Sequence, residues 1–299
     1  MIKTSIVIPS RNERFLVKTV NDILAKHGDN IEIIVVLEGY WEHDLPNDKR
    51  VIHIHHGEPL GMRQSINDAV AISRGEYILK IDGHCMVDER MCDILAEDCG
   101  DTDILVPRRK RLDPENWTFT DTHKIDVDYE YLAAPTNPND WGGKGLNGKV
   151  WDERTKERKH ILVDENMSLQ GSGWFMKRSY FDFLELMDHK EYGPFWNEGQ
   201  ELGLKAWLSG GRLLTCKRTF YAHLHKGKKY GRGYKLTEHA LIKGRNKTIQ
   251  WFAFQKAWHK QKYPLEWLIE RFKPVPTWHD PKTGQLLVSF DQLREELGV

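Results

Sequence analysis

The stretch Tyr77-Ile78-Leu79-Lys80-Ile81-Asp82-Gly83-His84 decides the fold. A mostly apolar run of this length predicts a buried strand, and it ends in two side chains that can bind a metal ion. Successive side chains of a strand point to opposite sides, so Asp82 and His84 can point the same way. One carboxylate oxygen and one imidazole nitrogen suit a divalent cation such as Mn²⁺. An Asp-x-His triplet also occurs by chance, and its weight therefore depends on its surroundings.

Further apolar runs precede this strand and alternate with helical patterns. We expect strands at residues 3–8, 31–37 and 51–55, and helices at residues 13–26 and 61–73. This alternation predicts an α/β fold with a mainly parallel, Rossmann-like sheet flanked by helices. Ligands of such sheets bind beyond the carboxyl ends of the strands. Residues 9–12, 38–39 and 82–84 are therefore expected to share one rim.

The second half of the chain is less regular. From residue 107 to about residue 164 we expect a long excursion of loops facing the substrate, including the glycine-rich Trp141-Gly142-Gly143-Lys144-Gly145. Order returns in residues 169–183, and we expect a helix at 198–209 and a strand at 212–216. Beyond residue 226 the chain is basic and largely helical, and it ends in a short amphipathic segment at 290–297.

The charge is unevenly distributed, although the 299 residues carry no formal net charge. From Lys226 to Lys273 there are 13 lysines and arginines against three acidic residues. Residues 226–235 are rich in glycine, tyrosine and cations, as in a flexible loop that can close over a diphosphate or grip phosphates. Trp251 and Trp258, seven residues apart, also fit a helix that faces the core and leaves its lysines in solvent.

The composition also bears on location. No run of about 18 apolar residues predicts a membrane span, and the amino-terminal strand is too short to be a signal peptide. We expect the four cysteines to be buried free thiols: Cys85, Cys92, Cys99 and Cys216. These features predict a reduced, cytoplasmic protein of a bacterium or a phage-infected cell.

A third metal ligand should come from elsewhere in the chain. His223 follows the predicted strand at 212–216, and His225 is an alternative two residues later. Another histidine cluster, at residues 53–56, falls in a predicted strand, and we expect it to be structural.

The order of these motifs resembles that of the GT-A-fold glycosyltransferases of family 2. The resemblance covers roughly residues 3–226 and rests on Ile6-Val7-Ile8-Pro9-Ser10-Arg11-Asn12-Glu13, Gly61-Met62-Arg63-Gln64-Ser65-Ile66-Asn67, Arg74-Gly75-Glu76-Tyr77-Ile78 and the Asp-x-His triplet. The usual metal motif of family 2 is Asp-x-Asp, whereas Asp-x-His is similar to that of the polypeptide N-acetylgalactosaminyltransferases. Those enzymes also carry an aromatic-Gly-Gly-Glu-Asn stretch before a helix, which resembles Phe195-Trp196-Asn197-Glu198-Gly199-Gln200-Glu201-Leu202.

The resemblance implies a domain organisation and a reaction. A GT-A catalytic domain would span 1–225, with a nucleotide-binding half at about 1–106 and an acceptor-side half at about 107–225. A basic extension would follow at 226–299. The implied reaction is metal-dependent transfer of a hexose or N-acetylhexosamine from a nucleotide sugar, UDP-linked by similarity, to a hydroxyl group.

The resemblance also implies the residues on the nucleotide side, which are Pro9, Arg11, Glu13, Glu38, Arg63 and Asn67. The first three would line the pocket of the base and ribose. Glu38 stands near the position of an Asp that contacts uracil in many relatives. The last two would approach the nucleotide from their helix.

On the diphosphate, Asp82, His84 and His223 would hold Mn²⁺ or Mg²⁺, with His225 as the alternative to His223. The stretch Gly171-Ser172-Gly173-Trp174 resembles the loop that approaches the sugar.

Glu198 would contact the donor sugar or the acceptor hydroxyl, and Glu201 is the second catalytic candidate. Family 2 has a Glu-Asp pair whose Asp is the catalytic base of inverting members, but this sequence reads Glu198-Gly199. Either Glu198 accepts the proton, or the enzyme retains configuration and the leaving phosphate accepts it. Retention is slightly favoured.

The acceptor stays open at this point. DNA with hydroxymethylated pyrimidines, as in some phages, suits the basic, tryptophan-bearing region. A cell-envelope glycan or lipid-linked acceptor suits a basic flank near anionic lipids, and a protein is a third candidate.

Two rival functions are a nucleotide-sugar-binding module without transfer activity and a nucleotidyltransferase. The joint presence of Asp82, His84, His223 and Glu198 argues against the first. The second fits less well because no glycine-rich signature follows the first strand.

Overall fold

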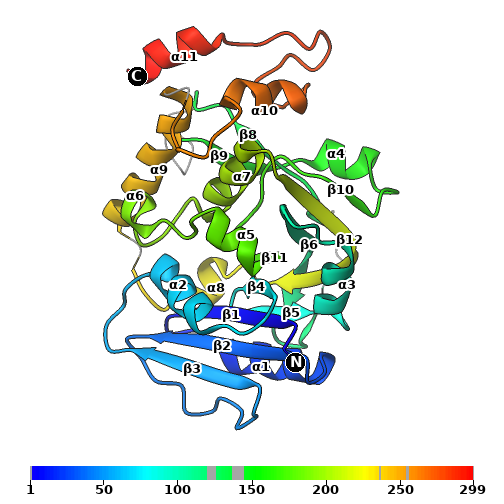
Figure 1. The fold of residues 1–299 in the computed structure, drawn as a ribbon, viewed down its shortest axis with the longest axis vertical. Coiled ribbons are helices and arrows are strands. Elements are labelled where there is room, and N and C mark those ends of the chain that lie inside the picture. Colours follow the sequence, from blue (N-terminus) through cyan, green and yellow to red (C-terminus); the bar gives the residue numbers. More distant parts are fainter. Residues whose placement is uncertain (1, 120–125, 137–144, 236, 254–255, 299) are drawn as a thin grey trace.

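The computed structural model describes residues 2–119, 126–136, 145–235, 237–253 and 256–298 (Figure 1). A ten-stranded mixed sheet dominates these residues, with the strand order β10-β12-β6-β11-β4-β1-β2-β3. Two further strands lie outside this order: β5 pairs with β12, and β7 pairs with β6. A separate pair of strands is formed by β8 and β9. Of the glycine-rich stretch 141–145, residues 141–144 lie outside the described residues.

The first half of the sheet is parallel, as the alternation of strands and helices predicts. It contains β1 (Thr4–Ser10), β2 (Ile31–Glu38), β3 (Val51–His56) and β4 (Tyr77–Ile81). The connecting helices are α1 (Leu16–Lys26) and α2 (Met62–Ile72). Every residue of β2 and β4 is buried, which explains why these strands read as continuous apolar runs. The predicted α/β fold is confirmed.

The second half of the sheet differs from the prediction. β6 (Asp103–Asp113) is a single long strand that runs through the proline at 107, where we expected loops to begin. β12 extends over Arg212–His223 instead of ending at residue 216, with an irregularity between Cys216 and Phe220. The two strands pair with each other along this length, so each supplies the backbone hydrogen bonds that keep the other extended.

Shorter elements complete the region between β4 and the carboxyl end of β12. The strands are β5 (Cys85–Val87), β7 (Thr118–Phe119), β8 (Glu130–Ala133), β9 (Asn147–Val150), β10 (Val163–Glu165) and β11 (Gly173–Lys177). The helices are α3 (Met91–Asp98), α4 (Asp152–Glu157), α5 (Arg178–Phe183), α6 (His189–Tyr192) and α7 (Glu198–Ser209). β11 is antiparallel to β4 and β6, and it joins the two halves of the sheet.

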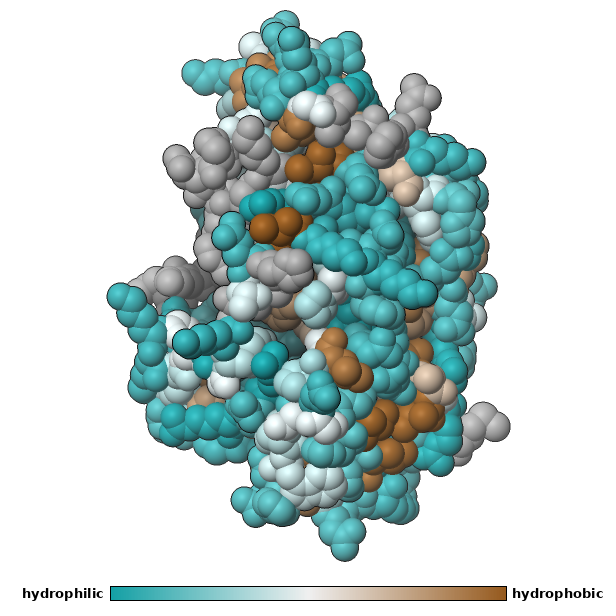
Figure 2. Space-filling model, turned by 90° about the vertical axis from the view of Figure 1, so that its left-hand side faces the viewer, coloured by the Kyte–Doolittle hydropathy of each residue, from teal (hydrophilic) through white to brown (hydrophobic). Residues whose placement is uncertain are grey.

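The sheet separates two hydrophobic cores, because alternate side chains of each strand point to opposite faces. Ile6 and Ile8 of β1 pack on the face covered by α1 and α3, whereas Val7 packs on the face of α2 and α7. All four cysteines are buried and free, as predicted. On the surface, hydrophobic residues lie in separate groups among hydrophilic ones (Figure 2).

The carboxyl-terminal extension contains α8 (Gly227–Tyr230), α9 (Glu238–Ala253), α10 (Leu265–Arg271) and α11 (Phe290–Leu297), drawn in yellow to red in Figure 1. Trp251 is buried, as predicted, but Trp258 lies in a turn beyond α9. Trp251, Leu268 and Trp278 belong to the same core as α7. The carboxyl-terminal extension therefore shares a hydrophobic core with the preceding segment. The domain boundary between residues 225 and 226 stays a prediction.

Within the described residues, no helix combines the length and the apolar composition needed to span a membrane.

Candidate active site

A cavity of about 900 Å³ opens at the carboxyl ends of β1 and β4. Its walls come from the loop after β1, the end of β4, the loop before β11, the start of α7, the β8–β9 pair and the segment after β12. The predicted rim is therefore the site of the cavity, as expected for a parallel sheet.

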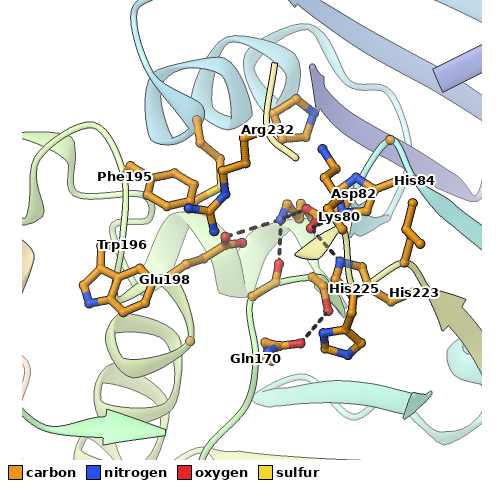
Figure 3. Close-up of a pocket in the computed structure, with 18 of the residues that line it drawn as sticks. Lys80, Asp82, His84, Gln170, Phe195, Trp196, Glu198, His223, His225 and Arg232 are labelled. Atoms are coloured by element: carbon orange, nitrogen blue, oxygen red, sulfur yellow. Dashed lines mark hydrogen bonds and ion pairs between the residues drawn. The ribbon is translucent and has the colours of Figure 1, made fainter. Parts of the chain in front are cut away.

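Asp82, His84 and His223 meet at one side of this cavity (Figure 3). Their ligand atoms lie within 4.8 Å of one another. Asp82 Oδ2 is 3.3 Å from His223 Nε2 and 3.8 Å from His84 Nε2. β12 brings His223 into this position by pairing with β5, in a register that places His223 opposite Cys85. The three ligand atoms thus converge on one point of the cavity wall.

This donor set fits a divalent cation. A carboxylate oxygen and two imidazole nitrogens are ligands that Mn²⁺ accepts, and an imidazole must be neutral to coordinate. Burial lowers the pKa of His223 to about 3, so its ring is neutral at physiological pH. Burial opposes ionisation of Asp82, but Lys80 and His223 hold its pKa well below its usual range. The ligand set predicted from sequence is thereby brought together.

The predicted alternative, His225, lies differently. Its ring stacks edge-on against His223, with centroids 5.4 Å apart, and it points toward Gln170 (Figure 3). Within the described residues the clustered ligand set contains His223 and not His225.

Glu13 occupies an unexpected place. We expected it in the base and ribose pocket, but its Oε2 accepts hydrogen bonds from His84 Nδ1 at 3.0 Å and from Lys226 Nζ at 2.5 Å. Burial opposes its ionisation, yet these two partners lower the pKa of Glu13 to about 2. A carboxylate cannot donate, so Nδ1 of His84 carries the hydrogen of this contact, and Nε2 is the ring atom that faces Asp82.

Lys80 is a functional candidate that the sequence reasoning missed. Its ammonium group donates to Asp82 Oδ1 at 2.7 Å, to the Gly171 carbonyl at 2.5 Å and to Glu198 Oε2 at 3.3 Å. The side chain is almost fully buried. Burial alone would lower the pKa of Lys80, but the two carboxylates raise it, so the cation is retained. The sequence did contain one sign of this role, because Lys80 is the only charged residue within the apolar strand Tyr77–Ile81.

Glu198 lines the cavity at the start of α7 (Figure 3). Its Oε1 accepts a hydrogen bond from Trp174 Nε1 at 2.6 Å, while Oε2 faces Lys80. Burial raises the pKa of Glu198, and the charge of Lys80 opposes this. The chain reaches α7 through Trp196 and Asn197, whose φ angles of 81° and 52° are left-handed. Such backbone strain in non-glycine residues is typical of functional sites.

The sugar-side loop predicted from sequence divides into two parts. Gly171 and Ser172 line the cavity, whereas Gly173 and Trp174 lie in β11. Gly173 packs against the ring of Tyr221, and Trp174 is buried, where it anchors Glu198. Gly173 and Trp174 therefore contact residues next to the cavity and do not line it themselves.

Three predicted residues lie outside the cavity lining: Arg63, Asn67 and Glu201. Arg63 and Glu201 are both fully buried and form an ion pair. Arg63 also donates to the Trp196 carbonyl at 2.8 Å. Asn67 pairs with the backbone N–H and carbonyl of Met187. Direct contact of these residues with a nucleotide, and a catalytic role for Glu201, are not supported by this geometry, because the side chains lie outside the cavity lining and find their partners inside the protein.

The cavity is lined by four of the residues that the resemblance assigns to the nucleotide side: Pro9, Arg11, Glu13 and Glu38. Glu38 accepts a hydrogen bond from the Gly61 N–H at 2.6 Å. The Arg11 guanidinium lies over the ring of Tyr234, 4.6 Å from its centroid. Tyr234 is far away in sequence and belongs to residues 226–235, the segment that we expected to close over a diphosphate or grip phosphates.

The opposite wall holds further residues to which sequence reasoning gave no individual role. Phe195 and Trp196 lie across the cavity from the metal-ligand cluster, and Arg232 projects beside Phe195 (Figure 3). Glu130 of β8 lines the same cavity, 3.9 Å from Arg109.

Comparison with known proteins agrees with this fold. Residues 5–184 match the family model of glycosyl transferase family 2. Glycosyltransferase GlyG of Streptococcus pneumoniae serotype 4 (strain ATCC BAA-334 / TIGR4) is 29% identical over 125 residues, covering 38% of this chain and 42% of the relative. The Probable N-acetylgalactosaminyltransferase 8 of Caenorhabditis elegans is 24% identical over 165 residues, covering 53% and 36%.

A crystal structure of GalNAc-T7 with UDP, GalNAc and Mn²⁺ is similar to this fold, with a TM-score of 0.67 at 18% sequence identity. The similarity covers 83% of this chain and 48% of that chain. The chain thus spans less than half the length of each of these three relatives. These matches confirm the predicted resemblance to GT-A-fold enzymes, including the N-acetylgalactosaminyltransferases. Since the family model covers more than half of the chain, this protein belongs to glycosyl transferase family 2.

Proposed function

We propose that this protein transfers a hexose or N-acetylhexosamine from a nucleotide sugar, UDP-linked in the first instance, to a hydroxyl group. The observation that carries the proposal is the convergence of Asp82, His84 and His223 on the wall of the large cavity. The proposal is supported by the occurrence of this ligand cluster, a cavity of about 900 Å³ and the buried carboxylate of Glu198 together in a family 2 chain.

The three ligands would hold Mn²⁺, with Mg²⁺ as the alternative. When bound, the cation supplies charge neutralisation for the departing nucleoside diphosphate. The similar structure of GalNAc-T7 holds UDP and Mn²⁺, which supports the choice of cation and nucleotide. Imidazole ligands favour Mn²⁺ over Mg²⁺, because Mg²⁺ prefers oxygen ligands.

On the nucleotide side, Pro9, Arg11 and Glu38 would bind the base and ribose, and Tyr234 would extend the wall. Arg232 projects into the cavity and could pair with a diphosphate oxygen in a charge-assisted hydrogen bond.

Glu198 would contact the donor sugar or the acceptor hydroxyl. Trp174 and Lys80 each donate to one of its oxygens, which fixes the orientation of the carboxylate. Because this sequence reads Glu198-Gly199 and lacks the Asp that serves as base in inverting relatives, a reaction that retains configuration, with the leaving phosphate accepting the proton, remains the favoured course.

The choice of acceptor depends on whether the cations of the basic extension are free to bind a polyanion. Several of its cations pair with carboxylates of the preceding segment: Lys226 with Glu13, Lys229 with Glu115, Lys247 with Glu191, Lys260 with Glu185 and Arg271 with Glu165. Intramolecular pairing thus accounts for part of the charge that suggested nucleic acid. Hydroxymethylated DNA, an envelope glycan and a lipid-linked acceptor stay as candidates, and a cytoplasmic location stays a prediction.

The test is release of nucleoside diphosphate from a panel of nucleotide sugars, with Mn²⁺ or with a chelator. We expect Mn²⁺-dependent release from a UDP-sugar, and its loss in Asp82→Ala, His84→Ala and His223→Ala. His225→Ala, which changes the neighbouring histidine, is the matched control and should retain metal dependence. Stimulation by hydroxymethylated DNA would assign the acceptor.

Two outcomes would contradict the proposal. Release that persists unchanged in Asp82→Ala with chelator present would remove the cation from the mechanism. Metal-dependent binding of UDP-sugars without release from any donor would instead identify a binding module, and release of pyrophosphate a nucleotidyltransferase.

A further inference from the structure

Glu13 is the starting point, because its carboxylate joins two segments that the proposed reaction uses separately. It follows β1, and its side chain is 8% exposed. Oε2 accepts from a proposed metal ligand, His84, and from Lys226, the residue at which the basic segment begins. Oε1 accepts from the N–H of Phe15 at 3.3 Å, which fixes the orientation of the carboxylate.

The contact with His84 orients a ligand. With Nδ1 engaged by Glu13, the Nε2 atom of His84 faces the cavity and Asp82. The packing here is close, since a Cβ atom at Gly83 would lie 2.9 Å from Glu13 Cγ. The other imidazole differs: within the described residues, Nδ1 of His223 is buried without a hydrogen-bond partner. A carboxylate behind a ligating histidine fixes the ring and raises its basicity.

The contact with Lys226 fastens a wall of the cavity. Residues 226, 227, 231, 232 and 234 line the cavity after β12. Lys226 is tied to Glu13 at one end of this segment, and at the other end the carbonyl of Gly233 accepts from Asn12 Nδ2 at 3.2 Å. A Cβ atom at Gly233 would lie 2.6 Å from Asn12 Cβ, so the backbones approach closely. The loop after β1 thus holds both ends of the segment.

We propose that Glu13 is a positioning residue with two roles: it orients His84 for the divalent cation, and it fastens residues 226–234 over the donor site through Lys226. This assigns Glu13 to the support of the metal site and not to the base and ribose pocket. The proposal rests on the proposed function only in taking Asp82, His84 and His223 as a cation site.

The test measures the two roles separately, without donor, acceptor or turnover. Mn²⁺ binding to the protein alone is followed by the electron paramagnetic resonance signal of free Mn²⁺. Fastening of the segment is followed by the rate of tryptic cleavage after the lysines and the arginine of residues 228–235, a range that excludes position 226 because one variant replaces that lysine. Circular dichroism verifies that each variant is folded.

Four variants separate the roles. Glu13→Ala should weaken Mn²⁺ binding about 10- to 100-fold and speed cleavage. Glu13→Gln keeps an acceptor for His84 Nδ1 but loses the ion pair, so cleavage should speed up while most Mn²⁺ affinity is retained. Lys226→Met should behave like Glu13→Gln. The control, Glu115→Gln, removes an exposed partner of Lys229 and Tyr230 that does not touch a proposed ligand, so Mn²⁺ affinity should not change.

The outcomes are distinguishable from failure of the proposed function. If the unchanged protein binds no Mn²⁺, the proposed cation site fails and this inference fails with it. If the unchanged protein binds Mn²⁺ and Glu13→Ala binds it equally well, only the role at His84 is overturned. Unchanged cleavage in both Glu13→Gln and Lys226→Met would overturn the role at the segment, and these two variants serve even where Glu13→Ala does not fold.

Discussion

A Cβ atom at Gly199 would lie 1.9 Å from the carbonyl oxygen of Leu169. The first turn of α7 therefore packs directly on the backbone that precedes β11, and no side chain fits between them. This is the position at which inverting relatives are expected to carry their catalytic Asp. The packing of two backbones thus excludes that base, independently of the residue types elsewhere in the cavity.

Gly199→Ala should destabilise the fold by about 1–3 kcal/mol, because a well-packed site must shift to accept an added methyl group. Gly203→Ala is the matched control on the same helix, where a Cβ atom would meet its nearest neighbours at 3.7 Å. That variant should be neutral or slightly stabilising, since alanine favours helix over glycine. Urea unfolding of both variants measures the difference, and equal stabilities would contradict the packing argument.

Lys80→Met should destabilise the protein by about 3–5 kcal/mol, because it leaves the buried carboxylate of Glu198 and the partly buried carboxylate of Asp82 without their shared cation. Lys177→Met is the control, since Lys177 pairs with the exposed Asp101 and should cost less than about 1 kcal/mol. Thermal or urea unfolding provides the measurement. A loss no larger than that of the control would show that Lys80 is not needed to hold the two carboxylates.

Arg63 and Glu201 should behave as a structural pair. Glu201→Leu should lose about 3–5 kcal/mol, because it leaves the buried cations of Arg63 and Lys205 without their shared carboxylate. Arg63→Met should lose less, because Glu201 keeps its ion pair with Lys205. The double variant should recover part of this loss, with a coupling energy of about 1–3 kcal/mol. A double-mutant cycle of unfolding free energies checks this. Strict additivity would mean that the two charges do not depend on each other.

The stability of the region around β10 should depend on acid pH through Asp164. Burial opposes its ionisation, but hydrogen bonds from Arg158 and Tyr129 lower the pKa of Asp164 from 3.8 to about 2. A lowered folded-state pKa contributes stability that is full above the unfolded-state value and is lost as the pH falls from about 4 through 2. The contribution at neutral pH is about 1–2 kcal/mol, allowing for the partly exposed Arg158.

Asp164→Asn should lose this contribution at neutral pH and flatten the dependence of the unfolding free energy between about pH 4 and pH 2. Urea unfolding across this range compares the two proteins. If the unfolding free energies of the variant and the unchanged protein vary with pH in parallel, Asp164 is not the source of the acid dependence.

The sequence by itself determined the parallel half of the sheet, the rim where ligands bind and two of the three proposed metal ligands. These features are encoded by near neighbours, since strand periodicity places Asp82 and His84 on one side and a continuous apolar run marks a strand buried on both faces. The third ligand was assigned by resemblance, and it lies 141 residues from Asp82.

Only the tertiary structure decided which polar residues reach the cavity. Arg63, Asn67 and Glu201 belong to motifs that suggested nucleotide contact, yet their partners are inside the protein. Glu13 lies 71 residues from His84 and 213 from Lys226, and its position behind the metal ligand depends on how β1, β4 and β12 align. Local patterns fix which way a side chain points from its own strand or helix, whereas its partner is fixed by the pairing of strands that are distant in sequence.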